Sequence, residues 1–134
     1  MIETERNSQS ARRLVDLYNA GTADWVDACH DPASQWHEMP TAAFPHGRSG
    51  GRDDLRAAAE HAVQLLPDRK MTIRRLIAEG SQVVLELDWE GTASASLGDA
   101  IRAGTQVRLR VAMFLTFSKG RVVEQVDYAI PWGA

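Results

Sequence analysis

The second half of the chain contains long runs in which every second residue is apolar. Residues 82–90 read Q-V-V-L-E-L-D-W-E and residues 107–117 read V-R-L-R-V-A-M-F-L-T-F, and an S-K-G turn leads from the latter into a further run over 121–130. Because successive side chains of a β-strand point to opposite faces, a period of two residues predicts three long antiparallel strands. A further strand is expected over 71–78. Along 82–90 one face is apolar and the other is polar, so we expect the sheet to be buried on one side and wet on the other.

The first half of the chain has helical spacing instead. Ser10 is positioned to cap a helix that ends at 19–21, and Thr22 to cap a short second helix that ends before Pro32. A strand is expected over 34–40, a Gly/Pro/Ser-rich loop over 41–51 and a third helix over about 53–66. This order predicts an α+β fold with helices on one face of a curved sheet, in a single domain over 1–134. A sheet that curls around helices leaves an opening at one end, which is a natural pocket.

Composition excludes several classes of function. The net charge is −3 and the basic residues are scattered, so we expect no nucleic-acid partner. No run approaches the ~20 apolar residues of a membrane span, and the first ten residues lack an apolar signal core, so the expected location is cytoplasmic. Cys29 is the only cysteine and the four histidines lack ligand spacing, so neither a metal site nor another cofactor is expected.

The order of elements resembles the nuclear transport factor 2-like superfamily. The residues that carry the resemblance are E-M-P at 38–40, G-R-S-G-G-R-D-D-L at 47–55 and M-F-L-T-F-S-K-G-R-V-V-E-Q-V-D-Y at 113–128. Within the superfamily the chain is most similar to the SnoaL-like polyketide cyclases and the ketosteroid-isomerase-like proteins. The resemblance implies a cone-shaped fold, with three N-terminal helices packed on a strongly curved, mostly antiparallel sheet. It leaves the activity open, because this fold carries isomerases, cyclases, hydrolases and non-catalytic domains.

Family patterns can be compared with this chain position by position. The resemblance to ketosteroid isomerases places a general base at Glu38, but Leu14 and Met113 stand where those enzymes carry oxyanion donors, which disfavours steroid isomerisation. Epoxide hydrolases of this fold carry Arg-x-Asp on the penultimate strand, whereas residues 110–112 read R-V-A, so epoxide hydrolysis is disfavoured as well. The acid/base residue of SnoaL-like cyclases matches the neighbourhood of Asp127.

The orientation of both carboxylates stays open at this level. Glu38 shares a strand face with Trp36, and an indole wall would desolvate the carboxyl group and raise its pKa into the range useful for proton transfer. The alternative is that Glu38 points to solvent or onto an arginine. Asp127 either lines the pocket or pairs with an arginine of the neighbouring strand.

We therefore expect a small, cofactor-independent enzyme of the lyase, isomerase or cyclase type. Glu38 or Asp127 would abstract a proton next to a carbonyl group of a hydrophobic, polyketide-like or polycyclic compound. The expected substrate-binding residues are Trp36, Tyr18, Leu87, Trp89, Met113, Leu115, Tyr128 and His46. A cavity of about 300 Å³ or more with a carboxylate inside would favour this reading. A cavity plugged by Trp36, Trp89 and Met113 would favour the alternative, a non-catalytic ligand-binding or assembly domain.

Two further expectations concern surfaces. The outer face of the sheet, which carries Val84, Ala112, Phe114 and Thr116, is apolar enough to be buried, so we expect a homodimer. The connection from Ala93 to Gly104 either folds over the pocket or extends the dimer contact.

Overall fold

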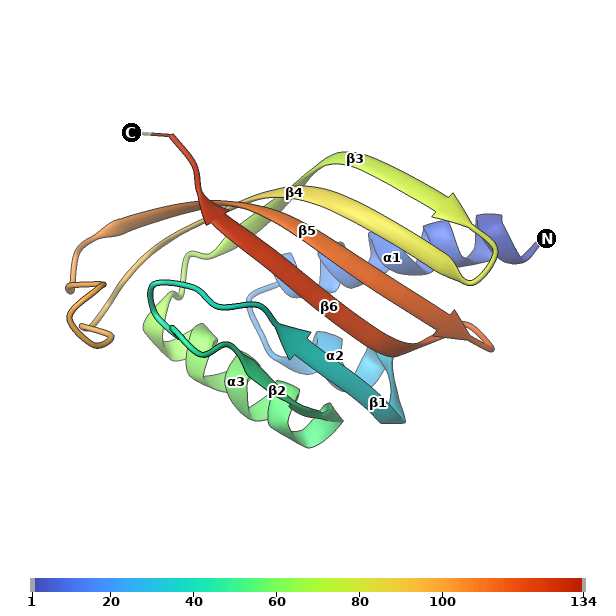
Figure 1. Ribbon diagram of the computed structural model, residues 1–134, viewed down its shortest axis with the longest axis horizontal. Helices are drawn as coiled ribbons and strands as arrows, with labels where there is room; N and C mark the ends of the chain where they lie inside the picture. Colours follow the sequence, from blue (N-terminus) through green and yellow to red (C-terminus); the bar gives the residue numbers. More distant parts are fainter. Residues whose placement is uncertain (1, 134) are drawn as a thin grey trace.

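A six-stranded sheet in the order β2-β1-β6-β5-β4-β3 forms the body of the molecule, and the helices pack on its inner side (Figure 1). The computed structural model describes residues 2–133. Within them the elements are α1 (Glu3–Asn19), α2 (Asp24–Cys29), β1 (His30–Glu38), β2 (Arg48–Gly51), α3 (Arg52–Leu65), β3 (Lys70–Glu79), β4 (Gln82–Thr92), β5 (Gln106–Ser118) and β6 (Arg121–Pro131). Strands β1 and β6 run parallel, and all other neighbouring strands are antiparallel. The predicted α+β class is confirmed.

The alternating runs form the long strands β4, β5 and β6, as predicted. Leu85 of β4 lies opposite Met113 of β5, and Met113 lies opposite Asp127 of β6, so these three positions share the inner face of the sheet. The inner residues of β4 and β5 are buried together with Leu14 of α1 and Leu55 of α3. The hydrophobic effect of this apolar face is what fixes which side of each strand turns inward.

Helix α1 begins seven residues before the predicted cap. Asn7 is 1% exposed, and its side-chain amide donates to the backbone oxygen of Gly80 at 3.0 Å. The backbone N–H of Gly80 in turn donates to the hydroxyl of Thr4 at 3.0 Å. The prediction of Ser10 as N-cap is therefore wrong, because contacts with the β3–β4 turn stabilise two additional helical turns. No helix within residues 2–133 is long and apolar enough to cross a membrane.

Strand β2 lies in the segment predicted to be a loop. It pairs antiparallel with β1, with Gly50 opposite Trp36 and Gly51 opposite Gln35. The side chain of Asp54 folds back to accept the N–H of Gly51 at 2.9 Å, at the start of α3. A Cβ atom at Gly50 would overlap this carboxylate, so glycine is required there. Strand β1 also begins at His30 rather than at residue 34, and it lies between β2 and β6, pairing in parallel with β6.

Candidate active site

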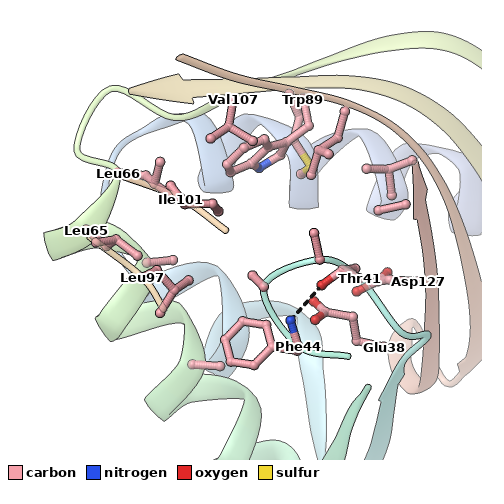
Figure 2. A pocket seen from close by; sticks show the side chains of 18 of the residues that line it. Glu38, Thr41, Phe44, Leu65, Leu66, Trp89, Leu97, Ile101, Val107 and Asp127 are labelled. Carbon is pink, nitrogen blue, oxygen red and sulfur yellow. Dashed lines mark hydrogen bonds between the residues drawn. The ribbon is translucent and has the colours of Figure 1, made fainter. Parts of the chain in front are cut away.

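A cavity of about 600 Å³ lies between the inner face of the sheet and the helices. Figure 2 shows Leu65, Leu66, Leu97 and Ile101 gathered at one side of it, with Glu38, Thr41 and Asp127 at the other. Leu97 and Ile101 belong to the connection between β4 and β5, so this connection folds over the cavity. The cavity is therefore mostly apolar with its carboxylates concentrated at one end, which is typical of sites for small organic ligands.

Asp127 is the carboxylate whose environment is most unusual. It lies on β6 with the same inward parity as Gln125, and its Oδ2 atom accepts the indole N–H of Trp36 at 3.3 Å. The side-chain amide of Gln125 donates to Oδ1 at 3.2 Å and to Oδ2 at 3.0 Å. Burial raises the pKa of Asp127 to about 7, against the opposing effect of these hydrogen bonds, and the charge of Glu38 adds to the increase. Near neutral pH both protonation states are populated, which is what a general acid/base needs.

Glu38 lies beside Asp127 but has a different environment. The two residues are opposite each other where β1 pairs with β6. Arg48 of β2 donates from Nε and Nη2 to the two carboxylate oxygens of Glu38, each at 3.0 Å. The guanidinium group also lies 3.7 Å from the centre of the Phe44 ring and 5.2 Å from that of Trp36. Glu38 thus lines the cavity and also pairs with an arginine. The bidentate pair engages both carboxylate oxygens of Glu38.

Tyr18 supplies a hydroxyl group to the same cavity. The indole N–H of Trp89 donates to this hydroxyl at 2.7 Å, so the phenol accepts one hydrogen bond and keeps its own proton for another acceptor. Burial raises the pKa of Tyr18, although the guanidinium of Arg69, 4.7 Å from the ring centre, opposes the increase. Tyr18 therefore stays neutral near pH 7. Tyr18 lies one helical turn after Leu14, and Leu14 stands where ketosteroid isomerases carry an oxyanion donor.

A buried polar chain continues from Asp127 away from the cavity. Gln125 is 2% exposed, and its side-chain oxygen lies 2.7 Å from Nε2 of His30, which is completely buried. The other ring nitrogen, Nδ1, lies 3.1 Å from the backbone oxygen of Val26 in α2. Burial lowers the pKa of His30, against the effect of both hydrogen bonds.

The family model of the SnoaL-like domain matches residues 11–125. The chain belongs to the SnoaL-like family. The resemblance inferred from the sequence is thereby confirmed. Among curated proteins, none matches this SnoaL-like chain.

Solved structures agree with this SnoaL-like domain over most of its length. It is similar to a candidate SnoaL-like polyketide cyclase from Jannaschia, with a TM-score of 0.79 and 15% identity over 95% of this chain and 87% of that one. It is similar to IdmH, a candidate polyketide cyclase from Streptomyces antibioticus, with a TM-score of 0.76 and 19% identity over 92% of this chain and 91% of that one. An LEH-like epoxide hydrolase of M. tuberculosis gives a TM-score of 0.75 and 15% identity over 96% and 85%. At these identities the likeness is one of fold.

The SnoaL-like chain brings most of the expected site residues together. The cavity is lined by Tyr18, Trp36, Glu38, Trp89, Met113 and Asp127. Four other expectations about the wall need correction. Leu87 and Leu115 are 0% and 1% exposed and belong to the hydrophobic core rather than to the cavity wall. Tyr128 has the opposite parity from Asp127, so it lies on the outer face, 47% exposed, with its ring 5.6 Å from that of Phe114. His46 lines a separate, smaller hollow beside His37.

Other residues of the site were missed in the sequence. The sequence predicts Arg48 in a loop and His30 near the end of the second helix, and it gives no role to Trp25, which lines the cavity. The pairing of Glu38 with an arginine was anticipated as an alternative, but nothing in the sequence named Arg48. Gln125 shares the parity of Asp127, and this was the one available signal for its place in the site.

Proposed function

We propose that this SnoaL-like domain is a cofactor-independent enzyme that transfers a proton at the carbon next to a carbonyl group of a hydrophobic, polyketide-like or polycyclic compound. The general acid/base in this proposal is Asp127. The observation that carries it is a carboxyl group whose pKa is about 7 at the polar end of an apolar cavity of about 600 Å³. The volume exceeds the ~300 Å³ at which ligand sites of this kind begin.

The chemistry follows from two polar groups that line the cavity, Asp127 and Tyr18. The Asp127 carboxylate takes the α-proton, and the electron pair of the broken C–H bond moves onto the carbonyl oxygen to give an enolate. The phenol of Tyr18 has a proton to donate to that oxygen, and one such donor contributes about 100-fold or more to the rate. In an isomerisation, Asp127 returns the proton to another carbon. In an aldol closure, the enolate carbon attacks a second carbonyl group and Asp127 protonates the resulting alkoxide.

The proposal assigns Glu38 a supporting role. Its two oxygens are engaged by Arg48, so removing a substrate proton would first require this bidentate pair to break. The pair instead holds the guanidinium against Phe44 and Trp36, and Trp36 is the indole donor to Asp127. Glu38 thus positions the group that contacts the acid/base.

The test measures proton exchange with solvent deuterium in a panel of aromatic polyketide and steroid ketones. Asp127→Asn should lose at least 100-fold in exchange rate, the lower end of what a general base contributes. Glu38→Gln should retain the reaction with a smaller loss. Exchange that survives in Asp127→Asn would refute the assignment. If panel compounds bind to the wild type without exchanging, the protein is a ligand-binding domain rather than an enzyme.

We further propose that the outer face of the sheet mediates a homodimer. Phe114, Tyr128, Ile130 and Trp132 are each 43–58% exposed on or beside this face, which is a large apolar area for a free surface. The neighbouring charges are paired within the chain, with Arg110 2.7 Å from Asp88, so they need no partner across an interface. Sedimentation at micromolar concentration should give twice the chain mass of 14.8 kDa, and a single-chain mass would refute the dimer.

The cytoplasmic location stays a prediction.

A further inference from the structure

A buried arginine packs against Tyr18 in the turn between α3 and β3. Arg69 is 3% exposed, and its guanidinium group lies 4.7 Å from the centre of the Tyr18 ring. Its Nη2 atom donates to the backbone oxygen of Thr22 at 3.1 Å, whereas Nε and Nη1 have no hydrogen-bond partner within residues 2–133. Tyr18 lines the cavity and Arg69 does not, so a ligand would contact the phenol rather than the guanidinium group.

The charge of Arg69 is not neutralised by a carboxylate of the described residues. The half-buried arginines Arg48, Arg52 and Arg110 each form an ion pair with a carboxylate, and Arg69 forms none. Charged side chains are almost never fully buried unless they are paired, because removal from water is costly. The site therefore holds a positive charge whose counter-charge is not supplied by the folded chain between residues 2 and 133.

Tyr18 connects this charge to the cavity. Trp89 donates to the hydroxyl oxygen at 2.7 Å, so the phenol proton is left for another acceptor. An anionic oxygen that accepts this proton in a hydrogen bond draws negative charge onto the phenol, where the guanidinium group is close enough to stabilise it. No bond breaks in this step, because the phenol shares its proton with the anion.

We propose that Arg69 is a positioning residue that acts through Tyr18, and that its charge stabilises an anionic oxygen bound at the Tyr18 hydroxyl group. The ligand class that fits is one that carries or develops such an oxygen, an enolate or a phenolate. Because a neutral ketone brings no negative charge, the stabilisation appears only when the enolate forms, and an interaction of this kind raises the rate rather than the affinity for substrate. The enolate rests on the function proposed above, whereas the coupling of Arg69 to Tyr18 does not.

A purely structural role of Arg69 would have a different signature. Such a role would consist of holding the turn between α1 and α2 through the backbone oxygen of Thr22, which requires a donor but no charge. Thr22 is exposed, so water can hydrogen-bond to this turn when the donor is removed. Variants that change the charge and the donor separately therefore distinguish the two roles.

A titration of Tyr18 measures the coupling without any substrate. Both tyrosines are replaced by a ring-fluorinated tyrosine, which ionises at lower pH, and ¹⁹F NMR follows each ring. In Arg69→Met and Arg69→Gln, the pKa of residue 18 should rise by about one to three pH units, the effect of losing an opposite charge at this distance. The charge of Asp127 also raises this pKa, and it is common to all variants. Tyr128 is 47% exposed and is the internal control, so its titration should not change.

Further variants separate charge from packing. Arg69→Lys keeps the positive charge, so most of the shift at residue 18 should be absent. Arg74→Met removes a positive charge of β3 that pairs with Asp88, and residue 18 should titrate as in the wild type. Arg69→Gln retains a donor for Thr22, so it carries the test if Arg69→Met does not fold. A phenol that titrates alike with and without the Arg69 charge, or that shifts equally in Arg69→Lys, would overturn the proposal.

The catalytic consequence is measured in the deuterium-exchange reaction. Arg69→Met should lower the maximal rate by about tenfold or more, the equivalent of one pH unit, and leave KM within about twofold, whereas Arg69→Lys should retain most of the rate. An unchanged maximal rate in a folded Arg69→Met protein would contradict the role of the charge in stabilising the enolate. If the wild type shows no exchange at all, the proposed function fails, and the titration still decides whether the charge of Arg69 acts on Tyr18.

Discussion

Replacing Asp127 by asparagine should remove a large pH dependence of the free energy of unfolding. The pKa of this carboxyl group is about 7 in the folded protein, where burial is the main cause, and its ordinary value is 3.8. Between these two pH values the folded protein holds a proton that the unfolded chain has released. By linkage, the wild type therefore loses stability as pH rises from about 4 to about 7, and the contribution of Asp127 is fully present only below pH 4.

The magnitude follows from the difference between the two pKa values. A difference of about three pH units corresponds to about 4 kcal/mol, at roughly 1.4 kcal/mol per unit. Asparagine has nearly the same shape and does not titrate, so Asp127→Asn lacks this loss. The stability of the variant relative to the wild type should rise by about 4 kcal/mol between pH 4 and pH 8.

Urea denaturation of both proteins at a series of pH values measures this difference. His30 titrates in both proteins, so its own contribution largely cancels when one curve is subtracted from the other. The control is Glu124→Gln, which replaces an exposed carboxylate on the same strand and leaves Asp127 in place. A stability difference between Asp127→Asn and wild type that does not change with pH would refute the reasoning, because it would mean that burial leaves the carboxyl group unperturbed.

Two further predictions concern the frame of the site. Gly47 has a φ of +72°, and a Cβ atom there would lie 2.5 Å from the backbone oxygen of Glu38, so Gly47→Ala should cost about 2 kcal/mol or more. Gly80→Ala, with a φ of +57° and nothing within 4 Å, is the matched control and should cost about 1 kcal/mol in the same denaturation assay. Trp89→Phe removes the donor to Tyr18, so stability should fall by about 1 kcal/mol and the pKa of this phenol should rise further, as seen by ultraviolet titration. A phenol that titrates as in the wild type would show that the 2.7 Å contact carries no energy.

The parts of the fold that follow a repeating pattern could be predicted from the sequence. The period of two in β4 and β5 predicted which side chains turn inward, because the apolar face of a strand is stable only when it is buried in the core. Strand β2 could not be predicted, since its two glycines pair through the backbone alone and leave no side-chain pattern. The first turns of α1 are stabilised by Asn7 and the β3–β4 turn, a contact between residues 73 positions apart.

The site was predictable to a smaller extent. β6 has polar residues on both faces, so its alternation left the direction of Asp127 open. The direction is decided by register, because Asp127 lies opposite Met113 of β5, whose inward face is unambiguous. The role of Trp36 as a donor to Asp127 rather than a wall for Glu38 also depends on the parallel pairing of β1 with β6, which brings distant segments side by side.

In the proposed reaction, the Asp127 carboxylate exchanges protons with a carbonyl compound bound in the cavity. The most direct measurement is the pH dependence of deuterium exchange at the carbon next to the carbonyl group, followed at low substrate concentration. The rate should rise with pH and level off above about 7, the pKa of Asp127, and it should fall at least 100-fold in Asp127→Asn. A rate that already levels off near pH 4, or one that persists in Asp127→Asn, would contradict it.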